Sequence, residues 1–351
     1  MTVEIRVRSV KPLRQTFGHI ARRFGDKPAT RYQEGTYDLQ SEVNHHYKPL
    51  WDPEHDIYDR RRTAIQMADW YALKDPRQYY YGSWTIARSR HQEAADRQME
   101  FAEKRDLLRH LPADLQAALQ RAILPLRHFE WGANTNLCFV SAYGYGTALT
   151  QATSMATMDR LGMAQHVSRI GLLLDGNTGS SLVEAKRLWM EDAAWQGLRR
   201  QTEAIFVLRD PIENFIAQAL VADALVYELC YRRFEPLWTA SQGAGVATLL
   251  DFPLRWQEET QRWVDSVVKT MAAESDANRK TLQGWVDSWR ARWNAALAPL
   301  AAAVLGESGG AAALTAADAA LGARLPKVGL KTTTTPAATP AATPATQGAA
   351  A

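Results

Sequence analysis

The stretch DPRQYYYGSWTIARSRHQEAADRQMEFAEKRDLLRHL, residues 75–111, decides how the rest of the chain is interpreted. It opens with a turn-forming Asp75-Pro76 pair and three tyrosines, and a long helical pattern follows. We expect Ser83 to be the N-cap, because its hydroxyl can accept a backbone N–H that a helix start leaves unpaired. Steps of three and four then define one helical face, made of Trp84, Ala87, His91, Ala94, Ala95, Gln98 and Ala102.

Composition predicts a soluble, cytoplasmic protein. The 351 residues are 46% hydrophobic and 23% charged, and the formal net charge of +3 is too small to indicate nucleic-acid binding. Cys138 and Cys230 lie too far apart for a disulfide framework or a zinc site, so we expect both to be buried and reduced. No export signal is visible, and no run approaches the roughly 20 apolar residues of a membrane span.

The chain divides into three parts, and the fold class that we expect is all-α. Residues 1–62 have many aromatic and charged residues but no sustained period, so we expect an extended arm that binds a partner. Residues 63–305 carry helical patterns throughout and predict a helical bundle. Residues 306–351 are rich in Ala, Thr and Pro and predict a disordered tail, because they offer little apolar surface to offset the entropy of ordering.

Helix signals subdivide the central part. The expected helices cover residues 64–73, the stretch quoted above, 115–144 with a kink at Pro125, 150–174, 181–208, 211–239, and 246–305 with a break near 274–278. Asp114 and Ser181 are the expected caps of two of them, and Asp210-Pro211 begins another. Trp285, Trp289 and Trp293 share one face, and we expect at least two of them to lie in the core.

A bundle of this kind can hold two iron ions, which requires a Glu-x-x-His pair on each of two helices and a Glu on each of the other two. The spacing occurs once, at Glu42–His45, inside the arm rather than in a long helix. No histidine follows His166, so the second helix pair carries no imidazole ligand. The sequence therefore predicts no metal site, no cofactor site and no catalytic residue in this chain.

Other site types are also missing from the sequence, which contains no HExxH, Walker loop, GxGxxG or GxSxG motif. We expect His91 to be a core histidine and Asp223 to be a buried acid with an arginine or hydrogen-bonding partner. Two alternatives stay open. One is a stand-alone helical enzyme with an unrecognised site around His91, Glu130 or Asp223, and the other is a helical adaptor or scaffold.

Three segments resemble a known family: DPRQYYYGSW at 75–84, EWGANTNLCF at 130–139, and the helix at 210–238. They are similar to the β subunit of bacterial multicomponent di-iron monooxygenase hydroxylases, in the phenol hydroxylase branch (the P1 oxygenase component). Toluene and soluble methane monooxygenases are related. The resemblance covers about residues 1–305, and the segment from Gly306 departs from the family.

The resemblance implies a ferritin-like bundle without metal ligands, serving as a non-catalytic structural subunit. The di-iron centre would lie in an α subunit, within an α2β2γ2 hydroxylase that needs a small effector protein and an NAD(P)H-dependent reductase with FAD and a 2Fe–2S cluster. Neither nucleic acid nor membrane is an expected partner. The candidate subunit-interface residues are the aromatics of the arm and of the opening stretch: Tyr32, Tyr37, Tyr47, Trp51, Tyr58, Tyr79, Tyr80, Tyr81 and Trp84.

Overall fold

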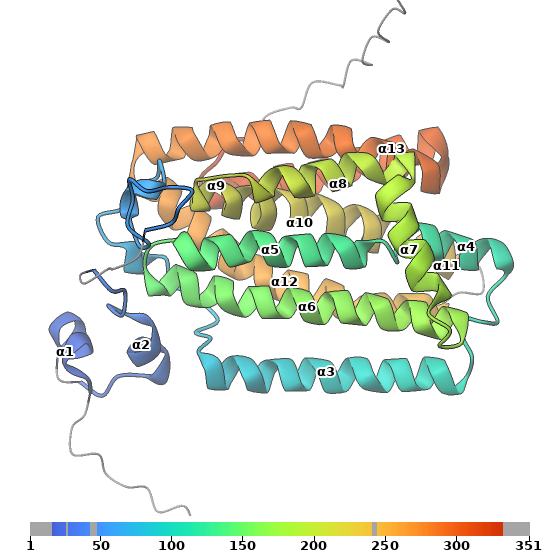
Figure 1. Ribbon diagram of the computed structural model, residues 1–351, viewed down its shortest axis with the longest axis horizontal. Coiled ribbons are helices and arrows are strands. Elements are labelled where there is room, and N and C mark those ends of the chain that lie inside the picture. The colour runs from blue at the N-terminus through green and yellow to red at the C-terminus, as the bar shows by residue number, and fades with distance from the viewer. Residues whose placement is uncertain (1–15, 26, 43–47, 241–243, 333–351) are drawn as a thin grey trace, which may run out of the picture.

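Long helices make up most of the chain in the computed structural model, which describes residues 16–25, 27–42, 48–240 and 244–332 (Figure 1). No strand occurs among these residues, so the all-α prediction is confirmed. The elements are α1 (Gly18–Phe24), α2 (Arg31–Thr36), η1 (Arg60–Arg62), η2 (Trp70–Ala72), α3 (Tyr81–Lys104), α4 (Ala113–Ala122), α5 (Leu126–Tyr143), α6 (Thr147–Asp175), α7 (Ser180–Glu191), α8 (Ala193–Phe206), α9 (Pro211–Phe215), η3 (Ile216–Ala222), α10 (Asp223–Val226), η4 (Tyr227–Arg233), α11 (Pro236–Thr239), α12 (Ala244–Glu274), α13 (Asp276–Arg324) and η5 (Leu325–Val328).

The centre of the bundle is built from α5, α6, α12, α13 and the helix that runs through α9, η3, α10 and η4. A tight turn at Gly144 and Gly146 returns the chain, so that α5 and α6 pack side by side along their length. The α3 helix lies outside this core against α6 and α12, and α7 crosses one end of the bundle (Figure 1). The central helices thus enclose a buried interior, and α5 and α6 also form part of the outer surface.

The predicted helix start at Asp210-Pro211 is confirmed, whereas the predicted cap at Ser83 is wrong. Asp210 caps α9 by accepting hydrogen bonds from the backbone N–H groups of Ile212 and Glu213, with Pro211 at the first helical position. The break predicted near 274–278 is real, and Ser275 caps α13 there. Ser83 is not the cap of α3, because the helix begins three residues earlier after Tyr80. Its hydroxyl instead accepts the N–H of Tyr80 at 3.1 Å.

The predicted helix over 64–73 is wrong, since only the short turn η2 forms there. Side chains that are distant in sequence accept three backbone N–H groups of this segment. Asp210 accepts from Ala64, Asn278 accepts from Gln66, and Glu274 accepts from Ala68. The segment is therefore fixed in an irregular path by the ends of three helices.

Two expected helices are each divided in two. The 115–144 helix separates into α4 and α5 at Pro125, and the N-cap of α4 is Pro112 rather than Asp114. The 181–208 helix separates at Asp192, whose carboxylate accepts the N–H of Ala194 and starts α8. Ser181 is not the cap of α7, which begins at Ser180 after Gly179. The chain is helical on both sides of each break.

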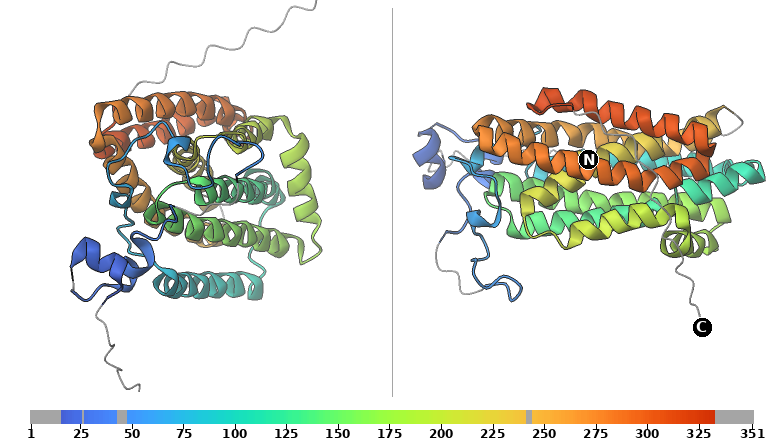
Figure 2. Two further views of the ribbon diagram at one scale, coloured as in Figure 1. Left: turned by 60° about the vertical axis from the view of Figure 1, so that its left-hand side comes forward. Right: turned by 90° about the horizontal axis from the view of Figure 1, so that it is seen from above.

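The prediction of a disordered tail from Gly306 is wrong for residues 307–332. Gly306, with φ 74° and ψ 165°, reverses α13, and its second limb runs back along the first, as Figure 2 shows. The Arg290 guanidinium binds the Asp318 carboxylate at 2.6 and 2.7 Å, and Gly310 lies against the backbone of Ala301. Composition misled the prediction because alanine and glycine allow close backbone packing, which needs no large apolar side chains. Residues 333–351 lie outside the described chain.

By length and composition alone, one helical segment of the described residues, Asp276–Val328, is apolar enough to cross a membrane. The sequence was expected to contain no such run. The reversal at Gly306 divides this segment into two limbs that pack against each other, and the second limb also meets α12 through an Arg324–Asp265 ion pair at 2.6 Å. The segment thus packs as a helical hairpin on the bundle.

The described part of the arm folds onto one end of the bundle. A small apolar cluster separate from the main core contains Ile20, Tyr32, Tyr37, Tyr71 and Ala148. The Arg23 guanidinium stacks on the rings of Tyr37 and Tyr71 and binds the carboxylates of Asp38 and Asp69, each at 2.7 Å. Because this cluster is built largely from the arm itself, the arm is anchored without entering the bundle core.

Candidate functional site

A charged cluster occupies the centre of the bundle, where helices α5, α6 and α10 meet. Glu130 comes from α5, Arg160 from α6 and Asp223 from α10, and all three side chains are buried. Arg160 Nη1 donates to Glu130 Oε2 at 2.7 Å, and Arg160 Nη2 forms an ion pair with Asp223 Oδ2. The Trp256 ring covers the guanidinium, 4.4 Å from its carbon to the ring centroid. One arginine thus bridges two carboxylates from different helices.

Neutral side chains complete the cluster. The Tyr227 hydroxyl donates to Glu130 Oε1 at 2.7 Å, and Gln218 Nε2 donates to Asp223 Oδ1 at 2.9 Å. Gln218 in turn accepts a hydrogen bond from Asn136 Nδ2 at 2.8 Å. Gln218 lies in η3 and Tyr227 in η4, the two wide π-helical turns on either side of Asp223. Wide turns of this type re-aim helical side chains and often occur at functional sites.

The cluster holds two acids and one permanent cation in a water-excluded place. Burial raises the pKa of the Glu130 and Asp223 carboxyls, and the Arg160 charge offsets part of that rise. The two carboxylates in turn hold the pKa of Arg160 above its ordinary value against the effect of burial. Arg160 therefore stays charged, and it supplies the positive charge that neighbouring buried carboxylates require.

The residues of this cluster do not fit a di-iron centre. The donors are one Glu, one Asp, one Tyr and one Gln, and a guanidinium stands where a cation would bind. The nearest histidine along α6, His166, is engaged elsewhere, with its Nε2 2.7 Å from the carbonyl oxygen of Leu249. Among the described residues no group of three or more His, Cys, Asp or Glu side chains is placed to hold a metal ion. The Glu42–His45 pair falls partly in residues that are not described.

The opening stretch forms a second charged cluster, between α3, α6 and α12. Arg88 of α3 binds Asp159 of α6 with two hydrogen bonds, at 2.7 and 2.8 Å, and binds Glu259 of α12 at 3.0 and 3.1 Å. The indole N–H groups of Trp84 and Trp256 also donate to Asp159, at 3.0 and 2.9 Å. The motif thus holds α3 on the bundle through polar contacts.

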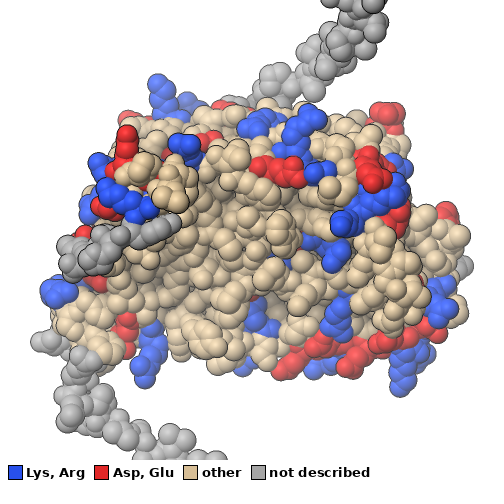
Figure 3. All heavy atoms as spheres, in the orientation of Figure 1, with Lys and Arg blue, Asp and Glu red and all other residues tan. Residues whose placement is uncertain are grey.

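One outer face of the bundle has few charged residues, and we call it the uncharged face. From Trp131 to Met158 the sequence contains no Asp, Glu, Lys or Arg, and this run covers most of α5 and the first part of α6. Figure 3 shows the result, a broad and mostly uncharged surface with a few Lys or Arg side chains, between the charged rim along α3 and the charged upper edge. Large apolar side chains lie exposed on this surface and on the adjoining α7 and α8: Trp131, Met158, Leu161, Val183, Met190, Phe206 and Val207. A surface of this kind is typical of a protein interface.

The structure distributes the candidate interface residues over three environments. Tyr32 and Tyr37 are only 5% and 9% exposed inside the small arm cluster, which leaves them little surface for a partner. Tyr58, Tyr79, Tyr80 and Trp84 are partly buried, and Tyr79 lies within 5.5 Å of the Arg77 and Arg88 guanidinium carbons. Trp51 and Tyr81 are exposed, and Trp51 packs on Phe139 and Tyr143 at one end of the uncharged face. Tyr47 lies outside the described residues.

Four expectations about single residues can be compared with the structure. Asp223 has the predicted arginine partner. His91 is half-buried rather than a core residue, and its ring lies beside Arg88 Nη1 at 3.4 Å instead of a carboxylate. Cys230 is buried as expected, with burial raising the pKa of its thiol. Cys138 is exposed, contrary to expectation, because it lies on the uncharged face.

Arg160 and the uncharged face were not predicted as features of interest. The signal for both was present: Asp159-Arg160 is an isolated pair of charges within a long uncharged helical sequence, which indicates burial with a partner. The 28 uncharged residues that precede it, 131–158, mark the face itself. Neither the charge pair nor the uncharged run is a motif of a known type of site, so motif spacing does not reveal them.

Comparison with known proteins assigns the chain to a class. The family model described as methane/phenol/alkene hydroxylase matches residues 51–275, and the chain belongs to this family. It is 50% identical to the phenol 2-monooxygenase oxygenase component DmpL of Pseudomonas sp. (strain CF600), over 94% of this chain and 99% of that protein. It is 48% identical to component MhpL of Acinetobacter pittii (strain PHEA-2), over 87% of this chain and 92% of that protein. The hydroxylase component subunit beta of the toluene-4-monooxygenase system of Ectopseudomonas mendocina is 23% identical, over 80% of this chain and 88% of that protein.

Solved structures agree with this assignment. Phenol hydroxylase from Pseudomonas sp. OX1 matches with a TM-score of 0.86 and 45% identity, covering 93% of this chain and 99% of the other. Toluene 4-monooxygenase matches with a TM-score of 0.73 over 87% of this chain and 100% of the other, at 18% identity, which shows the fold alone. The ferritin-like helical fold that the sequence predicted is therefore confirmed.

Proposed function

We propose that this chain is the non-catalytic structural β subunit of the hydroxylase (oxygenase) component of a phenol-type di-iron monooxygenase. The observation that carries the proposal is the position of Arg160, which bridges Glu130 and Asp223 at the centre of a ferritin-like bundle. A guanidinium there supplies charge compensation that does not involve a metal. The name of one relative, a hydroxylase component subunit beta, supports the same assignment.

The partners follow from this role. The chain would assemble with a larger α subunit that holds the di-iron centre and oxidises the substrate, and with a γ subunit, in an α2β2γ2 hydroxylase. A small effector protein and a reductase carrying FAD and a 2Fe–2S cluster would serve this hydroxylase in the cytoplasm. The names of the relatives, which are oxygenase or hydroxylase components, support a multi-protein system. The chain's own contribution would be to hold the α subunits in a fixed arrangement.

Metal analysis and activity assays test this proposal. We expect the isolated chain to contain no stoichiometric iron and to oxidise no phenol with NADH, O2 and the reductase. Co-expressed with the neighbouring oxygenase genes, it should purify in equimolar amount with a larger subunit that contains the iron. Two irons bound per isolated chain, or phenol hydroxylation by this chain and the reductase alone, would contradict the proposal. Failure to join any oxygenase complex would contradict it equally.

A further inference from the structure

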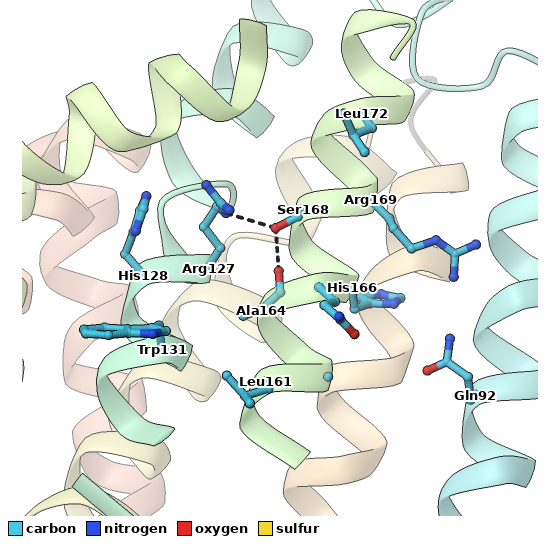
Figure 4. A pocket seen from close by; sticks show the side chains of 12 residues that line it. Gln92, Arg127, His128, Trp131, Leu161, Ala164, His166, Ser168, Arg169 and Leu172 are labelled. Carbon is cyan, nitrogen blue, oxygen red and sulfur yellow. Dashed lines mark hydrogen bonds between the residues drawn. The ribbon is translucent and has the colours of Figure 1, made fainter. Parts of the chain in front are cut away.

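A cavity of about 640 Å³ opens at one end of the uncharged face, between α3, α5 and α6 (Figure 4). Arg127, His128 and Trp131 line it from α5, and Gln92 lines it from α3. A second cavity of about 230 Å³ lies on the other side of His128 and Trp131 and extends toward α7 and α8. Trp131, which is 57% exposed, therefore stands between two hollows in an apolar surface.

Arg127 lines this cavity with a positive charge that no acid of the described chain neutralises. Its side chain is half-buried and its Nε donates to the Ser168 hydroxyl at 2.9 Å, but no carboxylate of the described chain forms an ion pair with it. Burial lowers its pKa, and no acid counteracts that effect. A guanidinium removed from water without a counter-charge is costly, so natural proteins rarely keep one unless something binds it.

The surroundings of Arg127 are also positive. Burial, together with the nearby charges of Arg127 and Lys186, lowers the pKa of the His128 imidazole to about 4. The remaining positive side chain in the larger cavity, Arg169, is paired with Asp96 outside it, and no Asp or Glu lines this cavity. Glu203 lines the smaller cavity but is paired with Arg199 at 2.7 Å. The described chain therefore offers Arg127 no free carboxylate.

We propose that this cavity receives an aspartate or glutamate of the larger, metal-bearing oxygenase subunit, with apolar neighbours of that residue packing around Trp131. The inference rests on the proposed function, and it names the surface and the chemistry by which the two subunits meet. A carboxylate would pair with Arg127 in the fork geometry that guanidinium groups favour. The exposed apolar side chains around it would exclude water from the pair, as the periphery of an interface does around its central contact.

A second copy of this chain fits the cavity less well. The acids on the adjoining α7 and α8 already have arginine partners, since Glu184 binds Arg187 at 2.7 Å and Asp192 binds Arg121 at 3.2 Å. Glu130 of α5 and Asp159 of α6 are buried, and Asp175 at the end of α6 accepts hydrogen bonds from the backbone N–H groups of Thr178 and Ser181. Two copies meeting through this face would therefore bring Arg127 toward further cations rather than toward an acid.

Substitutions in the co-expressed complex test the proposal. Arg127→Glu should weaken the association with the larger subunit at least about tenfold, because two carboxylates would then face each other. Trp131→Ala should weaken it by a similar factor. The matched controls on α3, Arg97→Glu and Phe101→Ala, change an exposed cation and a 55% exposed ring away from the cavity and should leave the association unchanged. Native mass spectrometry at graded dilution measures all four variants.

The isolated chain gives a readout that separates docking from folding. Arg127→Met removes a half-buried charge that has no carboxylate partner, so the melting temperature of the isolated chain should stay constant or rise while the complex weakens. A parallel fall in the melting temperature and in the strength of the association would show that Arg127 has a purely structural role, and it would overturn the proposal. An unchanged complex with Arg127→Glu and Trp131→Ala would overturn it as well, while leaving the proposed function intact.

Cross-linking identifies the occupant. With a photoreactive phenylalanine analogue at position 131 of the assembled complex, the expected adduct joins this chain to the larger subunit within a few residues of an Asp or Glu. A reversed charge at that acid, combined with Arg127→Glu, should then restore the association. An adduct with a second copy of this chain, with the γ subunit or with the effector protein would overturn the proposal. A wild-type chain that enters no complex would contradict the proposed function instead.

Discussion

The Arg160 guanidinium and the Asp223 carboxylate form an ion pair almost without solvent, since their side chains are 0% and 4% exposed. Replacing Arg160 with methionine, which is of similar length and uncharged, leaves Asp223 and Glu130 buried without their cation. We expect the free energy of unfolding of the isolated chain to fall by about 3–5 kcal/mol, which is usual for breaking a buried pair from one side. Urea denaturation measures the change.

A triple variant tests whether the lost stability comes from the unpaired carboxylates. Arg160→Met combined with Glu130→Gln and Asp223→Asn removes every formal charge of the cluster, so most of the lost stability should return. Arg97→Met, an exposed change on α3, should alter stability by less than about 0.5 kcal/mol. A loss below about 1 kcal/mol for Arg160→Met would show that the cluster does not need its cation.

A pH dependence follows from His166. Burial lowers the pKa of its imidazole to about 4, below the ordinary value of 6.5, although the contact with Leu249 counteracts burial. The unfolded chain therefore binds a proton there that the folded chain does not, and stability is lost as the pH falls from 6.5 toward 4. The contribution of this residue should fall by about 2 kcal/mol between pH 6.5 and pH 5. Comparing the unfolding of the wild type and of His166→Gln at both pH values isolates the contribution of His166 to stability. The exposed His110→Gln is the control.

Arg88 should fix α3 on the bundle more than apolar burial does. Only Ala95, Met99 and Ala102 of α3 are buried, whereas Arg88 binds carboxylates on both α6 and α12. Arg88→Met should therefore speed amide hydrogen exchange throughout α3 by at least about tenfold and leave α5 protected. The exposed Arg90→Met on the same helix should have no such effect. Equal exchange in both variants would mean that the apolar contacts alone hold the helix.

Gly306 should be sensitive to a side chain because of its backbone. Its φ of 74° with ψ of 165° lies in a region that is essentially restricted to glycine. Gly306→Ala should lower the free energy of unfolding by about 1–3 kcal/mol. Gly284→Ala, inside the same helix with no atom within 4 Å of the new methyl group, should raise it by about 0.5–1 kcal/mol. Thermal melts of the two variants should therefore shift in opposite directions.

Deleting residues 1–60 should weaken the oxygenase complex far more than it destabilises the bundle. The described arm packs in its own small cluster around Tyr37 rather than in the main core, which supports this expectation. Native mass spectrometry of the complex and a melt of the isolated truncated chain provide the two measurements. An intact complex containing the truncated chain would exclude the arm as an assembly element.

Features of the fold that depend on interactions between residues close in sequence could be predicted. The cap at Asp210 and the helix class itself depend on short-range rules, and both were predicted. The path of residues 64–73 depends on acceptors from Asp210, Glu274 and Asn278, which are remote in sequence, so periodicity alone suggested a helix that does not form. The hairpin after Gly306 is similar, because its packing relies on close backbones that composition does not reveal.

The candidate site also has features that the sequence predicts and features that depend on the packing of remote helices. Absence of the Glu-x-x-His code in long helices was readable from spacing, whereas the partner of Asp223 could be predicted only as a residue type. Which arginine fills that role depends on how α6 is rotated against α10, and this rotation is set by packing across the bundle. The same holds for Arg127, whose lack of an acid becomes visible only when all the neighbouring helices are in place.

The wide turn before Asp223 has a consequence for how this family can change over time. The backbone N–H of Asp223 bonds to the carbonyl of Gln218, five residues back, and the two side chains are also hydrogen-bonded. A turn whose hydrogen bonds span five residues holds one residue more than an ordinary helical turn, so it absorbs that residue without re-aiming the helix that follows. Losing one residue there would leave the later helix nearly in place but would separate the Gln218 and Asp223 side chains, because residues five apart do not share a face of an ordinary helix. An insertion or deletion outside the wide turns would instead rotate every later side chain by about 100°. Changes in the length of this helix should therefore fall within its wide turns.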